Sequence, residues 1–205
     1  MAQPTATGVV HPASVIGPNY CAPDPVDLAI LTKNPTITHG NFDVKDIQGN
    51  IVFKVREPLT FFFQRSRILL LDAAGNHIVT LSPKLTSNHD RWKVFRGDST
   101  NSGDLLFSTK RSSMFQFKTT LHVFLASNTR EEVCDFKVKG TFSERSCVIY
   151  AGDSSTVVAQ MHKKQSLKSV FLGKDHFMVT VNPNIDYAFI VALIVILYDV
   201  NRSRD

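Results

Sequence analysis

The feature that most constrains this fold is a continuous apolar run near the C-terminus, in the segment NPNIDYAFIVALIVILYDVNR. The ten residues from Ala188 to Leu197 include no polar side chain, and Asp186 and Asp199 stand on either side. A helix needs about 20 apolar residues to cross the hydrocarbon core of a bilayer. Ten residues cover roughly half of that thickness, and a longer span would place a carboxylate in the membrane. We therefore favour an element buried inside the protein, with an inserted segment as the alternative.

A helix in this run must be covered on every side, because Ile, Val and Leu fall all around a helical projection. Pro183 and Asn184 are typical of residues that precede a helix. Asp186 suits the positive N-terminal end of a helix, and Arg202 suits the negative C-terminal end. The many β-branched residues are also compatible with a central strand. The length of the run and its start signal predict a helix over about 185–200.

The rest of the chain is typical of many short strands. Apolar and polar residues alternate in FQFKTTLHVFLA (115–126) and in VCDFKVK (133–139), as expected for strands with one buried face. Similar patterns cover 28–32, 91–96, 104–109, 145–150, 156–163 and 176–182. Two further stretches, 40–55 and 67–81, each contain a D-x-x-G-N segment, in which Asp can cap the turn and Gly can adopt a left-handed conformation. Both stretches predict hairpins, which brings the total to about twelve strands.

Antiparallel strands in this number, with no amphipathic helix between them, favour a closed barrel or a sandwich. A barrel of about eight strands is already filled by its own side chains, so a wider barrel needs something else in its centre. The apolar helix would fill that space, and the barrel would cover the helix. The sequence therefore predicts a mainly β fold, a closed antiparallel barrel of about twelve strands around a central hydrophobic C-terminal helix.

Residues 1–25 differ from the rest of the chain in composition. They contain five of the nine prolines and no acidic or basic charge before Asp24, so we expect a flexible, proline-rich tail. Residues 26–205 are then expected to form a single domain. No secretory signal or lipidation motif is evident, and the three cysteines do not form an even disulfide framework. We expect an intracellular, cytoplasmic protein with reduced thiols, with the membrane periphery and the nucleus as alternative locations.

The common catalytic motifs are missing from the sequence. It contains no G-x-S-x-G, P-loop, G-x-G-x-x-G or H-E-x-x-H, and the seven histidines show no zinc-ligand spacing. A Cys–His nucleophile using Cys134 or Cys147 stays open, although both thiols fall in apolar strands, where inert buried cysteines are commoner. A turn explains His89 and Asp90 better than acid–base catalysis does. We expect no enzymatic activity, no cofactor and no metal site.

Basic residues provide the candidate binding site. The chain has 23 Lys and Arg against 18 Asp and Glu, and its net charge of +5 favours anionic partners weakly. Arg91 and Lys93 have the two-residue spacing that places strand side chains on one face. Lys110 and Arg111 precede two serines, and positive charge combined with hydroxyl donors suits a phosphate. The candidate anion- or phosphoinositide-binding residues are Arg91, Lys93, Lys110 and Arg111, with a plain solvated surface as the alternative.

Two more basic pairs occur later in the chain, Lys137 with Lys139 and Lys163 with Lys164. Exposed aromatic residues do not accompany the basic ones, since Trp92 alternates away from its basic neighbours in RWKVFR. Proteins that bind single-stranded nucleic acid usually interleave the two types. We therefore expect no nucleic-acid partner.

Longer stretches of the chain form a recognisable set. They are YCAPDPVDLAI (20–30), GNIVFKVREP (49–58), SNHDRWKVFRGDST (87–100), LLFSTKRSSMFQFKTTLHVFL (105–125), ERSCVIYAGD (144–153), VAQMHKK (158–164), SVFLGKDHFMVTV (169–181) and PNIDYAFIVALIVILYDVNR (183–202). From about Asn19 onward, the chain resembles the LURP-one-related family, a plant family of the tubby C-terminal-like superfamily, which also includes phospholipid scramblases. The resemblance implies the same barrel around a hydrophobic C-terminal helix.

The resemblance also implies a class of function. Tubby domains are known for phosphoinositide binding and a proposed membrane-tethered regulatory role, and the family takes its name from a member linked to defence against an oomycete pathogen. It brings no catalytic residue set, and it gives no position-by-position assignment of the tubby phosphoinositide-binding residues to this chain. It implies a non-enzymatic binding or regulatory module that engages phosphoinositide, other acidic phospholipid headgroups or a protein partner, with a link to plant defence.

Three alternatives remain for the function: a scramblase-like membrane protein, a membrane-tethered transcriptional regulator, and a protein–protein interaction domain without lipid binding. We expect a monomer without a transmembrane span.

Overall fold

The computed structural model describes residues 14–32, 41–58, 67–84, 91–112, 119–141, 146–162 and 176–202. These residues form a closed barrel in which consecutive strands are neighbours and β1 closes the ring by pairing with β12. The strands are β1 (Val26–Thr32), β2 (Phe42–Lys45), β3 (Ile51–Arg56), β4 (Ile68–Asp72), β5 (His77–Lys84), β6 (Arg91–Arg96), β7 (Leu105–Arg111), β8 (Thr119–Leu125), β9 (Phe136–Thr141), β10 (Ser146–Ala151), β11 (Val157–His162) and β12 (His176–Val181). Two short 3-10 helices, η1 (Pro18–Tyr20) and η2 (Ser102–Asp104), and one helix, α1 (Tyr187–Arg202), complete the order. The prediction of a closed antiparallel barrel around a C-terminal helix is confirmed.

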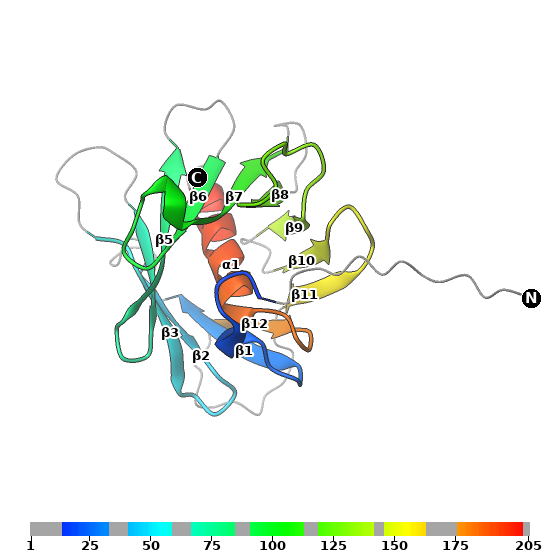
Figure 1. Cartoon of the computed structure of the whole chain (residues 1–205). Helices are drawn as coiled ribbons and strands as arrows, with labels where there is room; N and C mark the ends of the chain where they lie inside the picture. The colour runs from blue at the N-terminus through cyan, green and yellow to red at the C-terminus, as the bar shows by residue number, and fades with distance from the viewer. Residues whose placement is uncertain are drawn as a thin grey trace, which may run out of the picture.

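Helix α1 runs through the middle of the barrel, with the strands arranged around it (Figure 1). Every residue from Ala188 to Leu197 is at most 1% exposed. Phe189 packs edge-on against Phe107 of β7 at 5.0 Å and against Phe136 of β9 at 4.9 Å between ring centroids. The apolar run is therefore covered on all sides, as its lack of a polar stripe requires. Among the described residues, no helix combines the length and apolar character needed to cross a bilayer.

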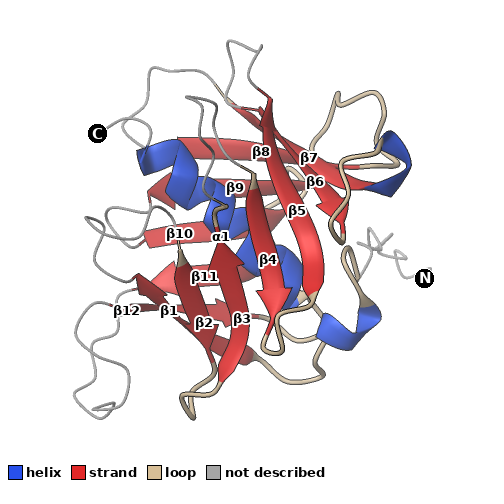
Figure 2. Ribbon diagram, turned by 90° about the vertical axis from the view of Figure 1, so that its left-hand side faces the viewer, coloured by secondary structure: helices blue, strands red, loops and turns tan. Residues whose placement is uncertain are grey.

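The alternation of side chains places one face of each strand against the helix. In β8, Thr119, Leu121 and Val123 are buried, whereas Thr120 and His122 are half-buried on the outer side. The prediction that Cys134, Phe136 and Val138 are buried is likewise confirmed. Figure 2, turned by 90°, shows β3, β4 and β5 crossing in front of α1. The period of two in the sequence thus separates a dry interior from a polar outer surface.

The two D-x-x-G-N segments form the expected hairpin turns. Asp72 Oδ1 accepts hydrogen bonds from the Gly75 and Asn76 amides at 2.8 Å, and Gly75 has a φ of +100° that few other residues adopt. Hydrogen bonds from Asn76 and Gly75 lower the pKa of the Asp72 carboxyl. Asp46 repeats the arrangement with Asn50.

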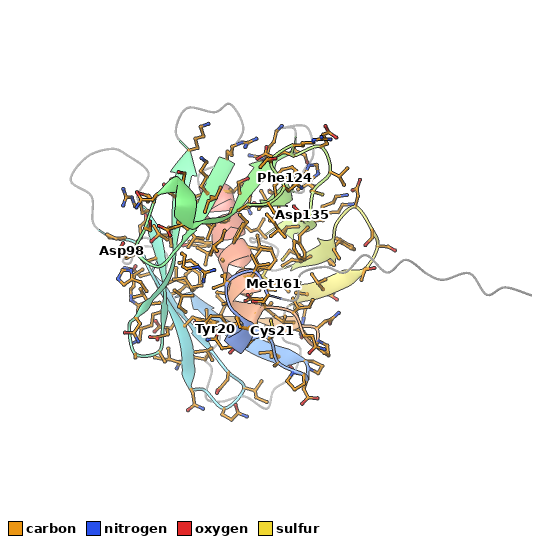
Figure 3. All side chains as sticks on the ribbon, viewed as in Figure 1. Tyr20, Cys21, Asp98, Phe124, Asp135 and Met161 are labelled. Carbon is orange, nitrogen blue, oxygen red and sulfur yellow. The ribbon has the colours of Figure 1, made fainter. Side chains whose placement is uncertain are left out.

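Part of the predicted N-terminal tail packs against the barrel. Residues 1–13 lie outside the described residues. Ile16 is 4% exposed and belongs to the core. Tyr20 packs on Phe53 at 5.8 Å and on Tyr187 at 5.6 Å, and Figure 3 shows Tyr20 and its neighbour Cys21 beside the start of α1. The physical reason is that the barrel end at the start of α1 exposes apolar surface, which these side chains cover.

Candidate functional site

The outer face of β6, β7, β8 and β9 brings basic side chains into one row. Arg91 of β6 lies directly opposite Lys110 of β7, which lies opposite His122 of β8, which lies opposite Lys137 of β9. Side chains directly opposite each other on one face have Cβ atoms about 5 Å apart. The row therefore crosses four neighbouring strands without interruption. We call Arg91, Lys110, His122 and Lys137 the basic row.

A pocket of about 420 Å³ lies against the middle of the basic row. It is lined by Lys110, Arg111, Ser112, His122, Phe124, Glu131, Glu132, Val133, Cys134 and Asp153. Phe124 points outward by the alternation of β8 and yet is only 4% exposed. The connection between β8 and β9, residues 126–135, covers it and forms one wall of the pocket.

Hydrogen bonds to its last residue, Asp135, hold this connection in place. Asp135 Oδ2 accepts hydrogen bonds from the Leu125 amide at 2.9 Å and from Asn128 Nδ2 at 2.8 Å. Asn128 Nδ2 also donates to the Val133 carbonyl at 2.8 Å. Figure 3 shows Phe124 and Asp135 close to each other on this side of the barrel. The β8–β9 connection is therefore a defined part of the pocket, held by both ends.

The four candidate residues divide between the two faces of the sheet. Arg91, Lys93 and Lys110 lie on the outer face, and Lys93 is exposed. Arg111 follows Lys110 directly, so its side chain alternates to the inner face, and the residue is 8% exposed. The structure thus brings Arg91 and Lys110 together and places Lys93 beside them, whereas Arg111 is buried on the inner face, although it still contributes to the lining of the pocket.

Three lysines lie around the middle of the basic row. Burial, followed by the charges of Lys137, Lys110 and Lys139, lowers the pKa of His122. Lys110 makes no ion pair with any of the described residues, although it lines the pocket. The hydrogen bond from Arg91 and, to a smaller extent, the charge of Lys110 lower the pKa of Glu131, so Lys110 lies near this carboxylate without forming an ion pair with it. An incoming anion would compete with the carboxylates of Glu131, Glu132 and Asp153 that line the pocket.

The two ends of the row are partly neutralised. Arg91 forms a bidentate pair with Glu131, and Lys137 Nζ donates to Asp153. Lys139, two residues further along β9, lies with its Nζ 5.7 Å from the centroid of the Tyr150 ring. Lys110 is therefore the cation of the row that makes no ion pair among the described residues, and it lies next to the pocket.

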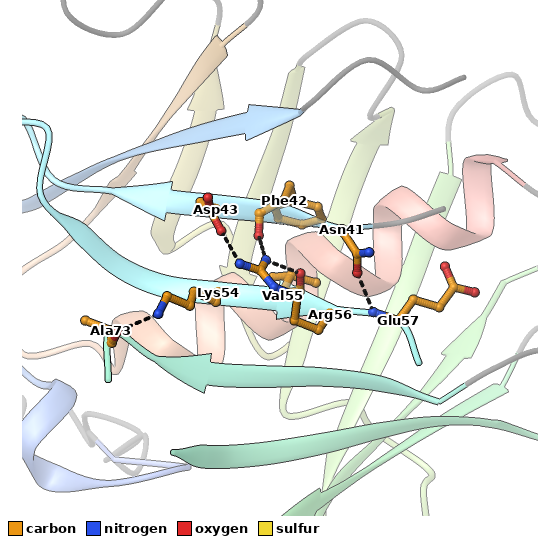
Figure 4. Close-up of polar contacts among 8 residues, drawn as sticks. All are labelled: Asn41, Phe42, Asp43, Lys54, Val55, Arg56, Glu57 and Ala73. Carbon is orange, nitrogen blue, oxygen red and sulfur yellow. Dashed lines mark hydrogen bonds and ion pairs between the residues drawn. The ribbon is translucent and has the colours of Figure 1, made fainter. Parts of the chain in front are cut away.

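Basic side chains on another side of the barrel serve the fold instead. Arg56 bridges β2 and β3, since Nη2 lies 2.8 Å from Asp43 Oδ1 and Nη1 donates to the Phe42 carbonyl at 3.1 Å (Figure 4). Lys54 Nζ donates to the Ala73 carbonyl in the β4–β5 turn at 2.7 Å (Figure 4). These groups are already satisfied within the sheet, in contrast with Lys110.

A second pocket, of about 510 Å³, lies between the N-terminal segment and the β4–β5 turn. Its basic residue Arg96 donates from Nη1 to the Ile16 carbonyl at 2.9 Å, which ties the segment to β6. The carboxylate of Asp72 in its wall accepts hydrogen bonds within the turn. This pocket is explained by the docking of the N-terminal segment.

The nucleophilic Cys–His pair considered from the sequence would combine Cys134 with His122 in the pocket beside the basic row. Cys134 and His122 line the same pocket. A catalytic thiolate–imidazolium pair needs a lowered thiol pKa and a raised imidazole pKa. Here burial raises the pKa of Cys134, and burial with the neighbouring lysines lowers the pKa of His122. Burial raises the pKa of Cys147 to about 12. Both thiols are thus disfavoured as nucleophiles.

Other residues considered from the sequence fall elsewhere. His89, Asp90, Lys163 and Lys164 lie outside the described residues. Within the described ranges, no three His, Cys, Asp or Glu side chains gather in a way that could hold a metal ion.

Sequence reasoning missed the central residue of the pocket, His122, and the acidic residue Glu131. Both come from segments far from RWKVFR in the sequence, and the strand register brings them together. The outward alternation of β8 was the signal available for His122. No local pattern marks Glu131, because its position depends on how the β8–β9 connection folds back over β7.

Comparisons with known proteins agree with the fold. The model of the LURP-one-related family matches residues 26–199. Protein LURP-one-related 15 of Arabidopsis thaliana is 56% identical over 200 residues, covering 98% of this chain and 89% of that protein. Protein LURP1 of Arabidopsis thaliana is 50% identical over 193 residues, covering 94% of this chain and 92% of that protein.

An X-ray structure of an Arabidopsis thaliana protein superposes with a TM-score of 0.73 at 47% identity, covering 93% of this chain and 99% of the other. The names of these relatives mention no enzymatic activity. The match to the family covers almost the whole barrel and α1. The chain therefore belongs to the LURP-one-related family.

Proposed function

We propose that this protein is a non-catalytic binding module that holds an anionic, phosphate-bearing ligand on the outer face of β6–β9. The observation that carries the proposal is Lys110, a half-buried cation without an ion pair among the described residues, between Arg91 and His122 and at the wall of the pocket. Serine and lysine donors in one concavity suit a phosphate. Phosphoinositide headgroups are the ligand we favour, since they carry phosphate groups and lie at the membrane surface, which is one of the locations expected for this protein.

The cysteine and histidine that line this pocket are poorly suited to nucleophilic catalysis. The pKa shifts of Cys134 and His122 run against nucleophilic catalysis. The burial of Ala188–Leu197 argues against a scramblase-like mode in which this run enters the bilayer, because the barrel would have to open first. The three free cysteines, Cys21, Cys134 and Cys147, support action inside the cell.

The regulatory part of the proposal rests on family membership. A relative at 50% identity is Protein LURP1, after which the family is named. We infer a regulatory, defence-linked role for this chain in plants, carried out through ligand or partner binding at the basic row. Loss of the gene should then change resistance to a pathogen, and resistance should return with the wild-type chain but not with a Lys110→Glu variant.

Vesicle co-sedimentation tests the binding directly. Phosphatidylcholine vesicles with and without a phosphoinositide are compared at low salt, where charge-driven binding is strongest. Lys110→Glu should weaken binding by roughly tenfold or more, because a carboxylate replaces the central cation. Lys45→Glu on β2 makes the same change in net charge away from the basic row and serves as the control.

A soluble inositol phosphate forms the second arm. Binding of the soluble compound with the same dependence on Lys110 shows that the phosphate chemistry suffices. Equal binding by Lys110→Glu and wild type in both arms would contradict the proposed site. An absence of binding to either probe at low salt would remove the anion-binding function and leave a protein partner as the alternative.

A further inference from the structure

We propose that Glu131 is an internal competitor at this site: its carboxylate occupies Arg91 and Ser108 in the free protein, and a phosphate group of the ligand replaces it. The inference rests on the proposed function and adds its regulation. In this view the site is closed by its own β8–β9 connection until a stronger anion arrives.

The contact itself resembles a bound ligand. Arg91 Nη1 donates to Glu131 Oε1 at 2.9 Å, and Nη2 donates to Oε2 at 2.7 Å. Ser108 Oγ donates to the same Oε1 at 3.2 Å. A guanidinium group with a neighbouring hydroxyl donor also binds phosphate oxygens in a bidentate manner. The donors that Glu131 uses are therefore the donors that a phosphate would need.

The charges favour a phosphate over the carboxylate. Arg91 and Lys110 lie directly opposite each other on adjacent strands, and like charges in that position repel. A carboxylate carries one negative charge and makes its hydrogen bonds to Arg91 and Ser108, not to Lys110. A phosphate monoester carries about −1.5 to −2 at neutral pH, which matches the two cations together. This match selects a phosphate monoester as the ligand class.

The backbone shows that the connection holds Glu131 in place. Glu131 has a φ of +53°, a left-handed conformation that non-glycine residues seldom adopt. Its amide donates to Asn128 Oδ1 at 3.2 Å, within the loop that Asp135 anchors. The side chains of Arg91 and Glu131 keep 22% and 26% exposure, so solvent and ligand can reach the pair. The contact is thus built by the loop and open to competition.

The test compares two adjacent glutamates that line the same pocket. Glu131→Gln keeps the shape of the side chain and removes its charge, and Glu132→Gln makes the same change of charge at an exposed neighbour. Affinity for a soluble inositol phosphate and for phosphoinositide vesicles is measured by titration. We expect Glu131→Gln to bind roughly threefold to tenfold more tightly than wild type, because the competing anion is gone. Glu132→Gln should stay within about twofold of wild type.

Glu131→Asp distinguishes the effect of the two hydrogen bonds to Arg91 from the effect of the negative charge at position 131. It keeps the negative charge but shortens the side chain by one methylene, so the two-pronged contact with Arg91 is lost. We expect an affinity between those of wild type and Glu131→Gln. Unfolding midpoints of all variants, with and without ligand, verify that each one folds.

The outcomes distinguish this inference from the proposed function. If wild type binds and Glu131→Gln gains nothing, or gains no more than Glu132→Gln, the competitor role is wrong while the anion site stands. If neither wild type nor Glu131→Gln binds either probe, the anion site itself is wrong and the competitor role falls with it. A gain limited to the vesicle arm points to a lipid headgroup as the source of the phosphate, whereas a gain in both arms shows that the phosphate alone suffices.

Discussion

Asp186 connects two parts of the chain that are far apart in the sequence. Its Oδ1 accepts the Phe189 amide at 3.0 Å and so caps α1, while its Oδ2 accepts the amides of Val15, Ile16 and Gly17 at 3.1, 2.7 and 3.1 Å. The residue is 1% exposed. A buried carboxylate of this kind is tolerated because several donors satisfy it. One residue thus starts the central helix and holds the N-terminal segment over it.

Asp186→Asn should destabilise the protein strongly. The amide group can supply only one acceptor oxygen, so either the cap or the three amides lose their partner. We expect the free energy of unfolding to fall by about 2–4 kcal/mol in urea denaturation, the usual cost of leaving several buried amides unsatisfied. Asp24→Asn, at an exposed position, is the control and should change it by less than about 0.5 kcal/mol. A change for Asp186→Asn as small as that of the control would contradict the role assigned to this carboxylate.

His122 gives the stability of the protein a pH dependence. Burial, with Lys137, Lys110 and Lys139, lowers its pKa below the ordinary value of 6.5. As the pH drops below that value, the unfolded chain takes up a proton that the folded chain resists. The free energy of unfolding therefore falls toward acid pH.

His122→Gln should remove this component of the acid destabilisation. Urea unfolding at about pH 7.5 and about pH 5.5 measures the difference, which should be smaller in the variant than in wild type. His162→Gln, on the exposed side of β11, serves as the control. An unchanged difference in His122→Gln would show that the pKa of His122 is not lowered in the folded protein.

Among the elements, α1 is the one whose burial the sequence determined most clearly. The run predicted a helix over about 185–200, and α1 extends over Tyr187–Arg202. The run is too short to cross a bilayer and has no polar face for solvent, so burial inside the protein was the arrangement best compatible with it. The alternation of apolar and polar residues predicted the strands of the barrel. A closed sheet of this width needs a central element to fill it, and the apolar helix supplied that element.

Ile194→Asp tests the role of α1 as the filling of the barrel. Ile194 is fully buried. An unpaired charge in this position costs several kcal/mol against a total stability of about 5–15 kcal/mol, so the chain should fail to fold. Circular dichroism and refolding yield are the measurements. Ile194→Val should fold and lose about 1 kcal/mol. A well-folded Ile194→Asp variant would contradict the buried-helix account.

The candidate site was predicted less completely than the fold. Arg91, Lys93 and Lys110 fall on the outer face, as the spacing of Arg91 and Lys93 indicated. Arg111 does not, and alternation already forbids two adjacent strand residues from sharing a face. The pairing of Arg91 with Lys110, and the approach of Glu131 to both, depends on strand register and on one connection. Neither is encoded in a local pattern.

The N-terminal segment shows a similar limit. Its prolines indicated a flexible tail, and yet Ile16 is buried in the core. The segment gains its order from Asp186 and from the open end of the barrel, which are supplied by the far end of the chain. Composition shows that the segment has too little apolar surface to fold by itself. It does not show that another part of the chain provides hydrogen-bond acceptors and apolar contacts for the segment.

At the scale of the whole molecule, closure of the barrel leaves the outer surface as the place for recognition. The interior is filled by α1, and every strand has two partners, so no sheet edge is free for pairing with another chain. Arg56 of β3 is engaged in the sheet through Asp43, whereas Lys110 in the basic row makes no ion pair among the described residues. The pocket beside the basic row on β6–β9, which Lys110 and Glu131 both line, is the surface on which we propose that the ligand binds.

The most direct test of this account is the pKa of His122 measured by NMR with and without a saturating soluble inositol phosphate. His122 lines the pocket between Lys110 and Lys137, so it reports the charge that arrives there. The pKa of His122 should be below its ordinary value in the free protein and should rise when the phosphate binds. A ligand that binds and leaves the pKa of His122 unaltered would contradict the central claim, because the anion would then lie elsewhere on the barrel.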